Sequence, residues 1–237
     1  MSRAWCLVTA SEAEFRAVAS LFRKPVITTE DGLKIARCDK FVLLKSGIGA
    51  IGFAERFSAH LSSNDYDAAL ITGFAGALDP RLGKLKTVVY DRCRCGDDVV
   101  DCDSALSTEI AEAVAGSRGM GLTVAKVISE ASEKQRLWEL YGALAVDMES
   151  HPVLAVCARN GLPATALRVI SDEAGEDLPD FNRALGPNGN VLGSRMPGVL
   201  IARPAAAWRF LASMGPAMKA LKEALNAVMG GSLPRAI

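Results

Sequence analysis

The stretch ALAVDMESHPVLAVCARNGLPATALRVISDE, residues Ala143–Glu173, decides the fold because it holds two short apolar runs that each end in a carboxylate. The first run ends at Asp147-Met148-Glu149, and the second, Ala164–Ile170, ends at Ser171-Asp172. A buried strand of a parallel sheet reads as a short continuous apolar segment, and the residues at its carboxyl end face the crevice where α/β proteins bind ligands. The pattern predicts that Glu149 and Asp172 face one ligand.

Both carboxylate positions also have a simpler interpretation. Asp147 and Glu149 precede an expected helix, Glu149–Arg159, whose positive N-terminal end favours acids. Ser171-Asp172 is equally suited to cap a following helix. His151, near the start of the expected helix, fits a structural or interface role better than a catalytic one. The residues alone leave the ligand and capping interpretations open.

The residues before this stretch predict alternating strands and helices. Trp5–Ala10 reads as a strand, and Ser11 then caps a helix that carries Glu14 in its first turn, where acids are common. Ser46-Gly47-Ile48-Gly49 follows another strand, and its free amides at a helix start favour an anion. The turn expected at Gly73–Gly76 carries Phe74, which either packs locally or lines an apolar pocket.

Further elements follow from the same patterns. The other expected strands are Leu33–Cys38, Phe41–Lys45, Ala68–Thr72, Thr87–Tyr90 and Gly121–Ile128. The other expected helices are about Ala50–Leu61, Ser104–Ala115 with Ser104 as its cap, Glu133–Tyr141, and an amphipathic tail from Pro204. The tail is expected either to cover the sheet or to present Met, Trp and Phe side chains to an apolar substrate and to a membrane surface.

The composition limits the class of partner. The chain has 237 residues, of which 50% are hydrophobic, and this suffices for one core in a single domain, 1–237. Lys and Arg total 27, as do Asp and Glu, so no net charge attracts nucleic acid and a small-molecule ligand is favoured. The start of the chain lacks a signal-peptide pattern, and no apolar run approaches about 20 residues. We expect a cytoplasmic protein, with peripheral association with the inner membrane as a further option.

The six cysteines do not form a recognisable framework. In a reducing cytoplasm they are expected to be thiols. Cys93, Cys95 and Cys102 lie among aspartates, but their spacing matches no standard zinc pattern. We expect no metal, and the role of this cysteine cluster stays open.

Four motifs in order resemble the nucleoside phosphorylase and methylthioadenosine/S-adenosylhomocysteine nucleosidase superfamily. The paired signature is VDMES at Val146–Ser150 and RVISDEA at Arg168–Ala174, and LLKSGIG at Leu43–Gly49 and ITGFAGALDPRLGKLKTVVYD at Ile71–Asp91 agree with it. The tail after Pro179, DFNRALGPNGNVLGSRMPGVLIARPAAAW, resembles the hopanoid-associated branch, whose members are thought to act on adenosylhopane.

The resemblance implies a fold. It is a single-domain three-layer α/β/α structure with a central mixed, mostly parallel twisted sheet. Residues 179–237 would form a subfamily-specific loop and C-terminal helix. Members of this superfamily usually assemble as dimers or larger oligomers, so we expect a homodimer.

The resemblance also implies roles for the site residues. Asp172, oriented by Ser171, would protonate or hydrogen-bond adenine at N7, and Glu14 would deprotonate the incoming water. Glu149, with Met148 beside it, would hold the ribose hydroxyls. The remaining candidates for substrate binding are Gly73, Phe74, Ser46 and Gly47.

The resemblance implies one of two roles for Arg168, one in hydrolysis and one in phosphorolysis. It would either position Glu14 and water for hydrolysis or bind phosphate, the co-substrate of phosphorolysis. The Gly73–Gly76 segment lacks the arginine that phosphorylases of this superfamily usually place there, which favours hydrolysis. It also has Phe74 where nucleosidases usually carry a small polar residue, which keeps phosphorolysis open.

Several functions remain as alternatives. The first is cleavage of the N-glycosidic bond of adenosylhopane with release of adenine in hopanoid biosynthesis, without a cofactor. The others are a methylthioadenosine/S-adenosylhomocysteine nucleosidase of purine and methionine salvage, and a phosphate-dependent purine nucleoside phosphorylase. A nucleoside-binding module without catalysis and a structural partner in a lipid-biosynthesis complex are the non-enzymatic alternatives.

Overall fold

The computed structural model describes residues 4–38, 40–50, 52–186 and 191–231. Its strands are β1 (Ala4–Thr9), β2 (Val26–Glu30), β3 (Leu33–Cys38), β4 (Phe41–Lys45), β5 (Tyr66–Ala77), β6 (Thr87–Cys95), β7 (Asp98–Asp101), β8 (Ser117–Thr123), β9 (Ala145–Asp147) and β10 (Ala164–Asp172). Its α-helices are α1 (Glu12–Ala19), α2 (Phe53–Ser63), α3 (Ser104–Ala113), α4 (Ala131–Tyr141), α5 (Ser150–Arg159), α6 (Met196–Ala202) and α7 (Pro204–Gly230). Short 3-10 helices occupy Ile48–Ala50, Phe181–Ala184 and Gly193–Arg195.

The strands form one mixed sheet in the order β10-β6-β8-β9-β5-β1-β4-β3-β2, with β7 paired to β6. The central pairings β1–β4, β1–β5, β5–β10, β6–β8 and β8–β9 are parallel, and the other described pairings are antiparallel. Since β5 pairs with both β9 and β10, the pairings also close a ring through β6 and β8. The mixed sheet is confirmed, and this closure is an addition that the sequence did not predict.

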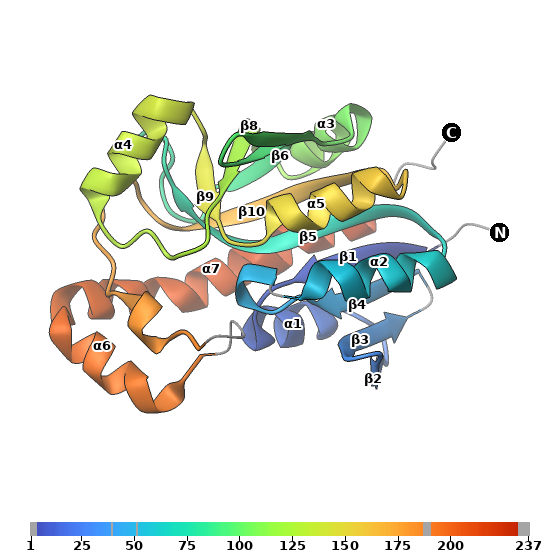
Figure 1. Cartoon of the computed structure of the whole chain (residues 1–237), viewed down its shortest axis with the longest axis horizontal. Coiled ribbons are helices and arrows are strands. Elements are labelled where there is room, and N and C mark those ends of the chain that lie inside the picture. Colours follow the sequence, from blue (N-terminus) through green and yellow to red (C-terminus); the bar gives the residue numbers. More distant parts are fainter. Residues whose placement is uncertain (1–3, 39, 51, 187–190, 232–237) are drawn as a thin grey trace.

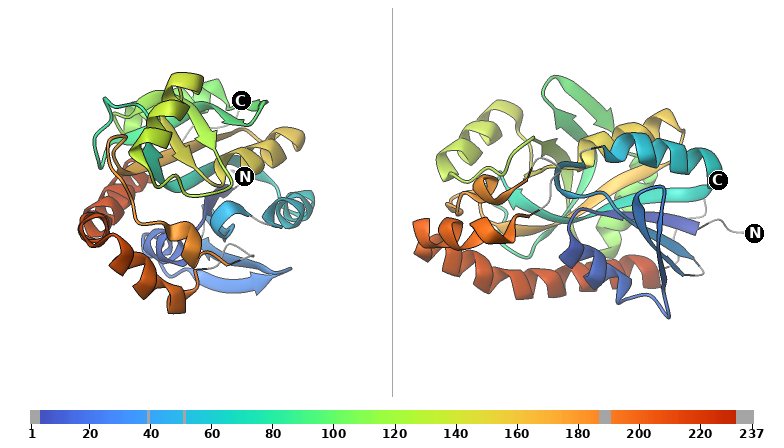
Figure 2. Two further views of the ribbon diagram at one scale, coloured as in Figure 1. Left: turned by 60° about the vertical axis from the view of Figure 1, so that its left-hand side comes forward. Right: turned by 60° about the horizontal axis from the view of Figure 1, so that its bottom comes forward.

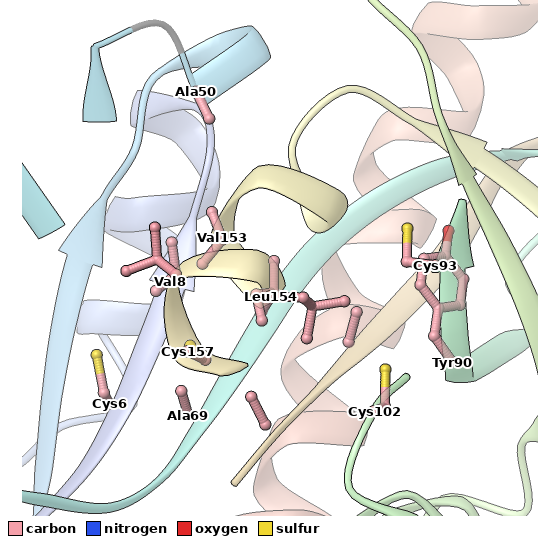
Figure 3. Packing of buried hydrophobic residues seen from close by; sticks show 14 of the residues in the cluster. Cys6, Val8, Ala50, Ala69, Tyr90, Cys93, Cys102, Val153, Leu154 and Cys157 are labelled. Carbon is pink, nitrogen blue, oxygen red and sulfur yellow. The ribbon is translucent and has the colours of Figure 1, made fainter. Parts of the chain in front are cut away.

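Helices cover both faces of the sheet, as the three-layer expectation requires (Figure 1, Figure 2). On one side α2 and α5 pack Phe53, Phe57 and Val153 into a core with β1 and β5. Figure 3 shows part of this core, including Leu154 and Cys157 of α5. On the other side α1, α3 and α7 contribute apolar side chains to a second core, among them Phe15, Val18, Leu106, Ile110, Leu221 and Leu225.

The expected turn at Gly73–Gly76 is wrong, because β5 continues through it to Ala77. The backbone there pairs with strands on both sides: Arg168 of β10 lies opposite Gly73, and Val146 of β9 lies opposite Gly76. Ladder hydrogen bonds to two neighbours satisfy the backbone groups that a turn would leave open. The glycines therefore belong to a strand whose residues line the site.

Several other boundaries also differ from the sequence-based expectation. The strand expected at Gly121–Ile128 is Ser117–Thr123, whose glycines concealed it; a Cβ at Gly121 would collide with the Tyr90 ring. The cap of α3 is Asp103, which accepts a hydrogen bond from the Leu106 amide at 2.8 Å, in place of Ser104. The strand expected at Thr87–Tyr90 continues to Cys95 and pairs with β7.

The C-terminal segment forms one long helix, α7, with Pro216 inside it. Its second half packs on the sheet, where Leu221 and Leu225 are fully buried, whereas Trp208 and Leu211 in its first half are exposed. Among the residues that the structure describes, no helix is long and apolar enough to cross a membrane.

Candidate functional site

A cavity of about 350 Å³ lies where the carboxyl ends of β1, β5 and β10 meet. Carboxylates from three separate parts of the chain line it: Glu14 of α1, Glu149 before α5, and Asp172 at the end of β10. Parallel strands end at one edge of a sheet, which explains how residues so far apart in the chain meet. The structure thus brings together the three carboxylates that the sequence singled out.

Glu14 takes part in the cap of α1 and also lines the cavity. Its Oε2 accepts a hydrogen bond from the Ser11 amide at 2.7 Å, and the Ser11 hydroxyl accepts one from the Glu14 amide at 3.1 Å, which completes a capping box. Its Oε1 accepts a hydrogen bond from the Phe74 amide at 3.0 Å. Glu14 is therefore both part of the helix cap and a lining residue of the cavity, and the cap fixes the position of its carboxylate.

Gly73 allows this approach of Glu14 to β5. Its φ is +152°, and a Cβ there would collide with Glu14 Oε1 and lie 3.0 Å from Nη1 of Arg168. A side chain would displace one of these groups, so glycine is required at this point of the strand. Gly73 is not among the residues that line the cavity, but it lies against Glu14, which does line it.

Glu149 also lines the cavity, and the glycine turn after β4 holds it there. Its Oε1 accepts a hydrogen bond from the Gly49 amide at 2.9 Å, and Nη2 of Arg168 lies 3.7 Å from its Oε2. Burial raises the pKa of Glu149 to about 7, with the nearby Asp147 carboxylate adding to the rise and Arg168 opposing it. Near neutral pH this group changes charge readily.

Arg168 is buried beneath the cavity and is fully engaged by the protein. Its Nε lies 3.1 Å from Asp147 Oδ2, and its Nη2 donates a hydrogen bond to the Ser150 hydroxyl at 2.8 Å. Burial opposes the charged form, but the carboxylates of Asp147 and Glu149 outweigh it and raise the pKa of Arg168 above its ordinary value. The guanidinium therefore supports the two carboxylates and is not among the residues that line the cavity.

Asp147 is the partner of Arg168 that sequence reasoning missed. Burial opposes its ionisation, but Arg168 and the hydroxyls of Ser150 and Thr123 lower the pKa of Asp147. Thr123 donates at 2.7 Å and Ser150 at 2.5 Å. An arginine inside an apolar strand such as ATALRVI must find an anion when it is buried, and this signal predicts a partner of the Asp147 kind.

Asp172 is held by its neighbour and by a lysine distant in sequence. Ser171 donates a hydrogen bond to Asp172 Oδ1 at 2.6 Å, and Lys134 Nζ lies 2.5 Å from Asp172 Oδ2. Lys134 also donates to the carbonyls of Glu173 and Glu176, at 2.8 and 3.0 Å. Sequence reasoning missed Lys134, because in ASEKQRLWELY it looks like any charge on a solvated helix.

The remaining candidates divide into two groups. Met148, Phe74 and Ser171 line the cavity as expected, whereas Ser46 and Gly47 do not. Ser46 is buried, and its hydroxyl donates to the carbonyls of Thr9 and Gly47. The neighbouring Ile48 lines the cavity in their place, and the turn contributes through the Gly49 amide on Glu149.

The far side of the cavity is apolar and comes from the segment after Asp172. The lining side chains there are Leu178, Phe181, Leu185, Val191, Met196 and Phe210. The rings of Phe181 and Phe210 pack with centroids 4.7 Å apart. The segment expected as a subfamily-specific loop therefore forms one wall of the cavity, whose polar end carries the carboxylates and whose other end is apolar.

None of the three cysteines of the cluster lines this cavity. Cys93 and Cys102 are buried, Cys95 is exposed, and burial raises the pKa of Cys102 to about 12. Among the described residues, no group of three or more His, Cys, Asp or Glu side chains is arranged to hold a metal ion.

Comparisons with known proteins find similar sequences and similar folds. A 5′-methylthioadenosine/S-adenosylhomocysteine nucleosidase of Marinomonas sp. (strain MWYL1) is 30% identical over 178 residues, which cover 61% of this chain and 77% of the relative. A mutant Helicobacter pylori nucleosidase with 5′-methylthioadenosine in its active site has the same fold, with a TM-score of 0.76 and 17% identity over 97% of this chain and 99% of its own.

A mutant futalosine hydrolase of Helicobacter pylori is equally similar, with a TM-score of 0.76 and 17% identity over 96% of this chain and 99% of its own. The model of the family described as the phosphorylase superfamily matches residues 5–189, which include the cavity carboxylates Glu14, Asp147, Glu149 and Asp172. The chain therefore belongs to the phosphorylase superfamily and is an enzyme.

Proposed function

We propose that the protein cleaves the N-glycosidic bond of an adenine nucleoside and releases adenine. The observation that carries this proposal is the meeting of Glu14, Glu149 and Asp172 in one cavity. Breaking this bond requires a donor to the leaving base, a negative group near the ribose as positive charge grows on it, and an activated nucleophile. The three carboxylates supply one group for each requirement, and the relative from Marinomonas is named for cleavage of such nucleosides.

Asp172 is proposed to act on the base. Ser171 and Lys134 each hold one of its oxygens, so the carboxyl has a fixed direction toward the cavity. In its carboxyl form it would donate its proton to adenine N7 as the bond to the ribose breaks, which leaves the Asp172 carboxylate. The positive Lys134 keeps this buried group from standing alone as an unpaired charge.

Glu149 and Glu14 are proposed to act on the ribose side. Glu149, beside Met148, would hold the ribose hydroxyls, and its negative form would favour the oxocarbenium-like transition state. Glu14 would take a proton from the attacking water, since its Oε1 and Oε2 are fixed by the amides of Phe74 and Ser11. Arg168 would act from below by holding Glu149 and Asp147 in place.

The position of Arg168 supports hydrolysis over phosphorolysis. Asp147, Glu149 and Ser150 already surround its guanidinium, so a phosphate would have to compete with two carboxylates for it. Among the described residues, those that line the cavity include no arginine, and Lys126 is the cation there. We therefore propose water as the nucleophile and keep phosphate as the co-substrate to test against it.

The apolar end of the cavity supports a nucleoside with an apolar group on its 5′ carbon. A cavity of about 350 Å³ is at the small end of ligand pockets, which span roughly 300–1,000 Å³. It is sized for the nucleoside, and Phe74, Phe181 and Phe210 would contact the start of the 5′ group. Adenosylhopane, with release of adenine in hopanoid biosynthesis, is the proposed substrate. Methylthioadenosine or S-adenosylhomocysteine is the second candidate, favoured by the name of the Marinomonas relative.

The test is adenine release from adenosylhopane in detergent and from methylthioadenosine, each with and without phosphate. Rapid release from the hopanoid alone supports the first substrate, and rapid release from methylthioadenosine supports the second. Dependence on phosphate would replace hydrolysis by phosphorolysis. Asp172→Asn serves as the inactive control, and adenine binding without release from any nucleoside would contradict the proposal.

We also propose that the enzyme works in the cytoplasm as a homodimer and contacts the inner membrane transiently. The helix α7 supports the membrane contact, because its first half leaves Trp208 and Leu211 exposed. Light scattering on the purified protein tests the dimer, for which a mass equal to one chain is the contradicting result.

A further inference from the structure

The exposed side of α7 changes character along the helix. In the first half the exposed residues recur at spacings of three and four, and they are apolar apart from one arginine. They include Ala205, Trp208, Arg209, Leu211, Ala212, Gly215 and Pro216. In the second half the exposed positions include Lys219, Glu223 and Asn226. Exposed faces of helices in soluble proteins are normally polar, so the second half is ordinary and the first half is not.

A neighbouring element extends this apolar surface. The helix α6 packs against α7. Its Ile201 is 76% exposed, and Trp208 of α7 is 75% exposed. We call the surface made by Ile201, Trp208 and Leu211 the apolar corner. Figure 1 shows α6 and the start of α7 together at one end of the molecule, below α4. Large side chains exposed together in this way mark sites of interaction.

The charge of this region is one-sided. Residues 181–222 contain six arginines and lysines and no aspartate or glutamate, although the whole chain has 27 of each sign. Arg195 and Arg209 are exposed, and within the described part of the chain they form no ion pair. Arg203 is paired with Glu130 and Asp177, and Lys219 with Glu223, so the unpaired positive charge comes from residues such as Arg195 and Arg209. This unpaired charge suits a negatively charged partner.

The apolar corner adjoins the site. Phe210, one residue from Arg209, lines the cavity, as does Met196 of α6. The elements that carry the exposed apolar side chains thus also carry apolar side chains of the cavity wall. A partner seated on the corner would lie next to the apolar end of the cavity.

We propose that the apolar corner is a docking surface for a lipid bilayer that contains anionic phospholipid. Trp, Ile and Leu side chains enter the interface between head groups and acyl chains, while Arg195 and Arg209 lie at the level of the phosphates. A second copy of the chain fits less well. A symmetric contact through the same face would bring its unpaired arginines together, and like charges brought together oppose association. This inference rests on the transient membrane contact proposed above and specifies its surface and its lipid, and it does not depend on which nucleoside is cleaved.

The test is sedimentation of the full-length protein with vesicles of phosphatidylcholine alone and of phosphatidylcholine with phosphatidylglycerol. Binding is expected to the anionic vesicles, and to fall about tenfold or more when salt is raised, because screening weakens attraction between exposed charges. A blue shift of the emission of Trp208 should accompany binding, since Trp5 is buried and Trp138 is partly buried.

The variant Trp208→Ser/Leu211→Ser should lower the partition onto anionic vesicles by about tenfold or more. Its matched control is Val26→Ser/Ile27→Ser, which removes two exposed apolar side chains from β2 and should bind as the unchanged protein does. Circular dichroism and thermal unfolding confirm that both variants are folded. These side chains do not line the cavity, so adenine release is measured separately and its failure leaves the vesicle result intact.

Three results would overturn the proposal. They are equal binding by the two double variants, no binding to anionic vesicles, and equal binding to neutral and anionic vesicles. A change in molecular mass of Trp208→Ser/Leu211→Ser by light scattering would assign the face to a second copy of the chain and would likewise overturn it.

Discussion

Lys134 Nζ lies 2.5 Å from Asp172 Oδ2, and neither side chain is exposed to solvent to any useful extent. The lysine comes from α4 and the aspartate from the end of β10, and the same ammonium group also binds the carbonyls of Glu173 and Glu176. All three protons of the ammonium therefore have acceptors. The pair joins the Asp172 end of the cavity to the segment that leads into its apolar wall.

Replacement of Lys134 by Met is expected to lower kcat by about 10–100-fold and the free energy of unfolding by roughly 3 kcal/mol, because it leaves a buried carboxylate without its partner. Kinetics of adenine release and urea unfolding measure the two effects. Arg136→Met, on the exposed side of the same helix, is the matched control and should change neither. Unchanged kcat in a folded Lys134→Met protein would show that the lysine does not position Asp172.

The charge of Glu149 should make stability depend on pH. Its pKa is raised from 4.5 to about 7 by burial, so between these values the folded protein holds a proton that the unfolded chain has released. The contribution of this group to the free energy of unfolding is fully present below the lower value and is lost as the pH rises toward the upper one.

Glu149→Gln removes this titration. Relative to the variant, the unchanged protein should lose up to roughly 3 kcal/mol of stability between pH values of about 5 and 8. Urea unfolding of both proteins across this range measures the difference. A difference between the two proteins that stays constant with pH would show that Glu149 titrates normally.

Gly73→Ala should inactivate the enzyme by about a hundredfold or more, because the new methyl group displaces Glu14 or Arg168. It should also destabilise the fold, since φ at this position is +152°. Gly175→Ala is the matched control, because a Cβ there meets nothing within 4 Å. Steady-state kinetics and thermal unfolding of both variants measure these effects. Equal activity of the two variants would contradict the packing of Glu14 on Gly73.

The cysteines should differ sharply in reactivity. Cys95 is exposed, whereas Cys6, Cys93, Cys102 and Cys157 are buried. Burial raises the pKa of each of these four thiols, so they are protonated at neutral pH and react slowly.

A thiol reagent should label Cys95 first in the native protein, and mass spectrometry of the labelled peptides checks this. In Cys95→Ser the fast phase should disappear. Fast labelling of Cys93 or Cys102 in the folded protein would contradict their burial beneath β7.

Capping and site interpretations compete at many carboxylates, and Glu14 shows why the sequence could not separate them. The Ser11 cap expected from the sequence is confirmed, and Glu14 completes a capping box with it. The same carboxylate accepts a hydrogen bond from the Phe74 amide. Capping depends on residues three apart, whereas the second contact joins residues 60 apart in the chain. Only packing of α1 against β5 creates the second contact.

The sequence by itself determined the strands that end in the site and the carboxylates at their ends, because apolar runs and turn residues act over a few neighbours. Tertiary structure alone decided that Arg168 serves Asp147, that Lys134 holds Asp172, that Gly73 and Gly76 lie within β5, and that Ser46 stays outside the cavity. A buried charge must find an opposite charge, and which one it finds depends on how the elements pack. Local patterns along the chain carry no record of that choice.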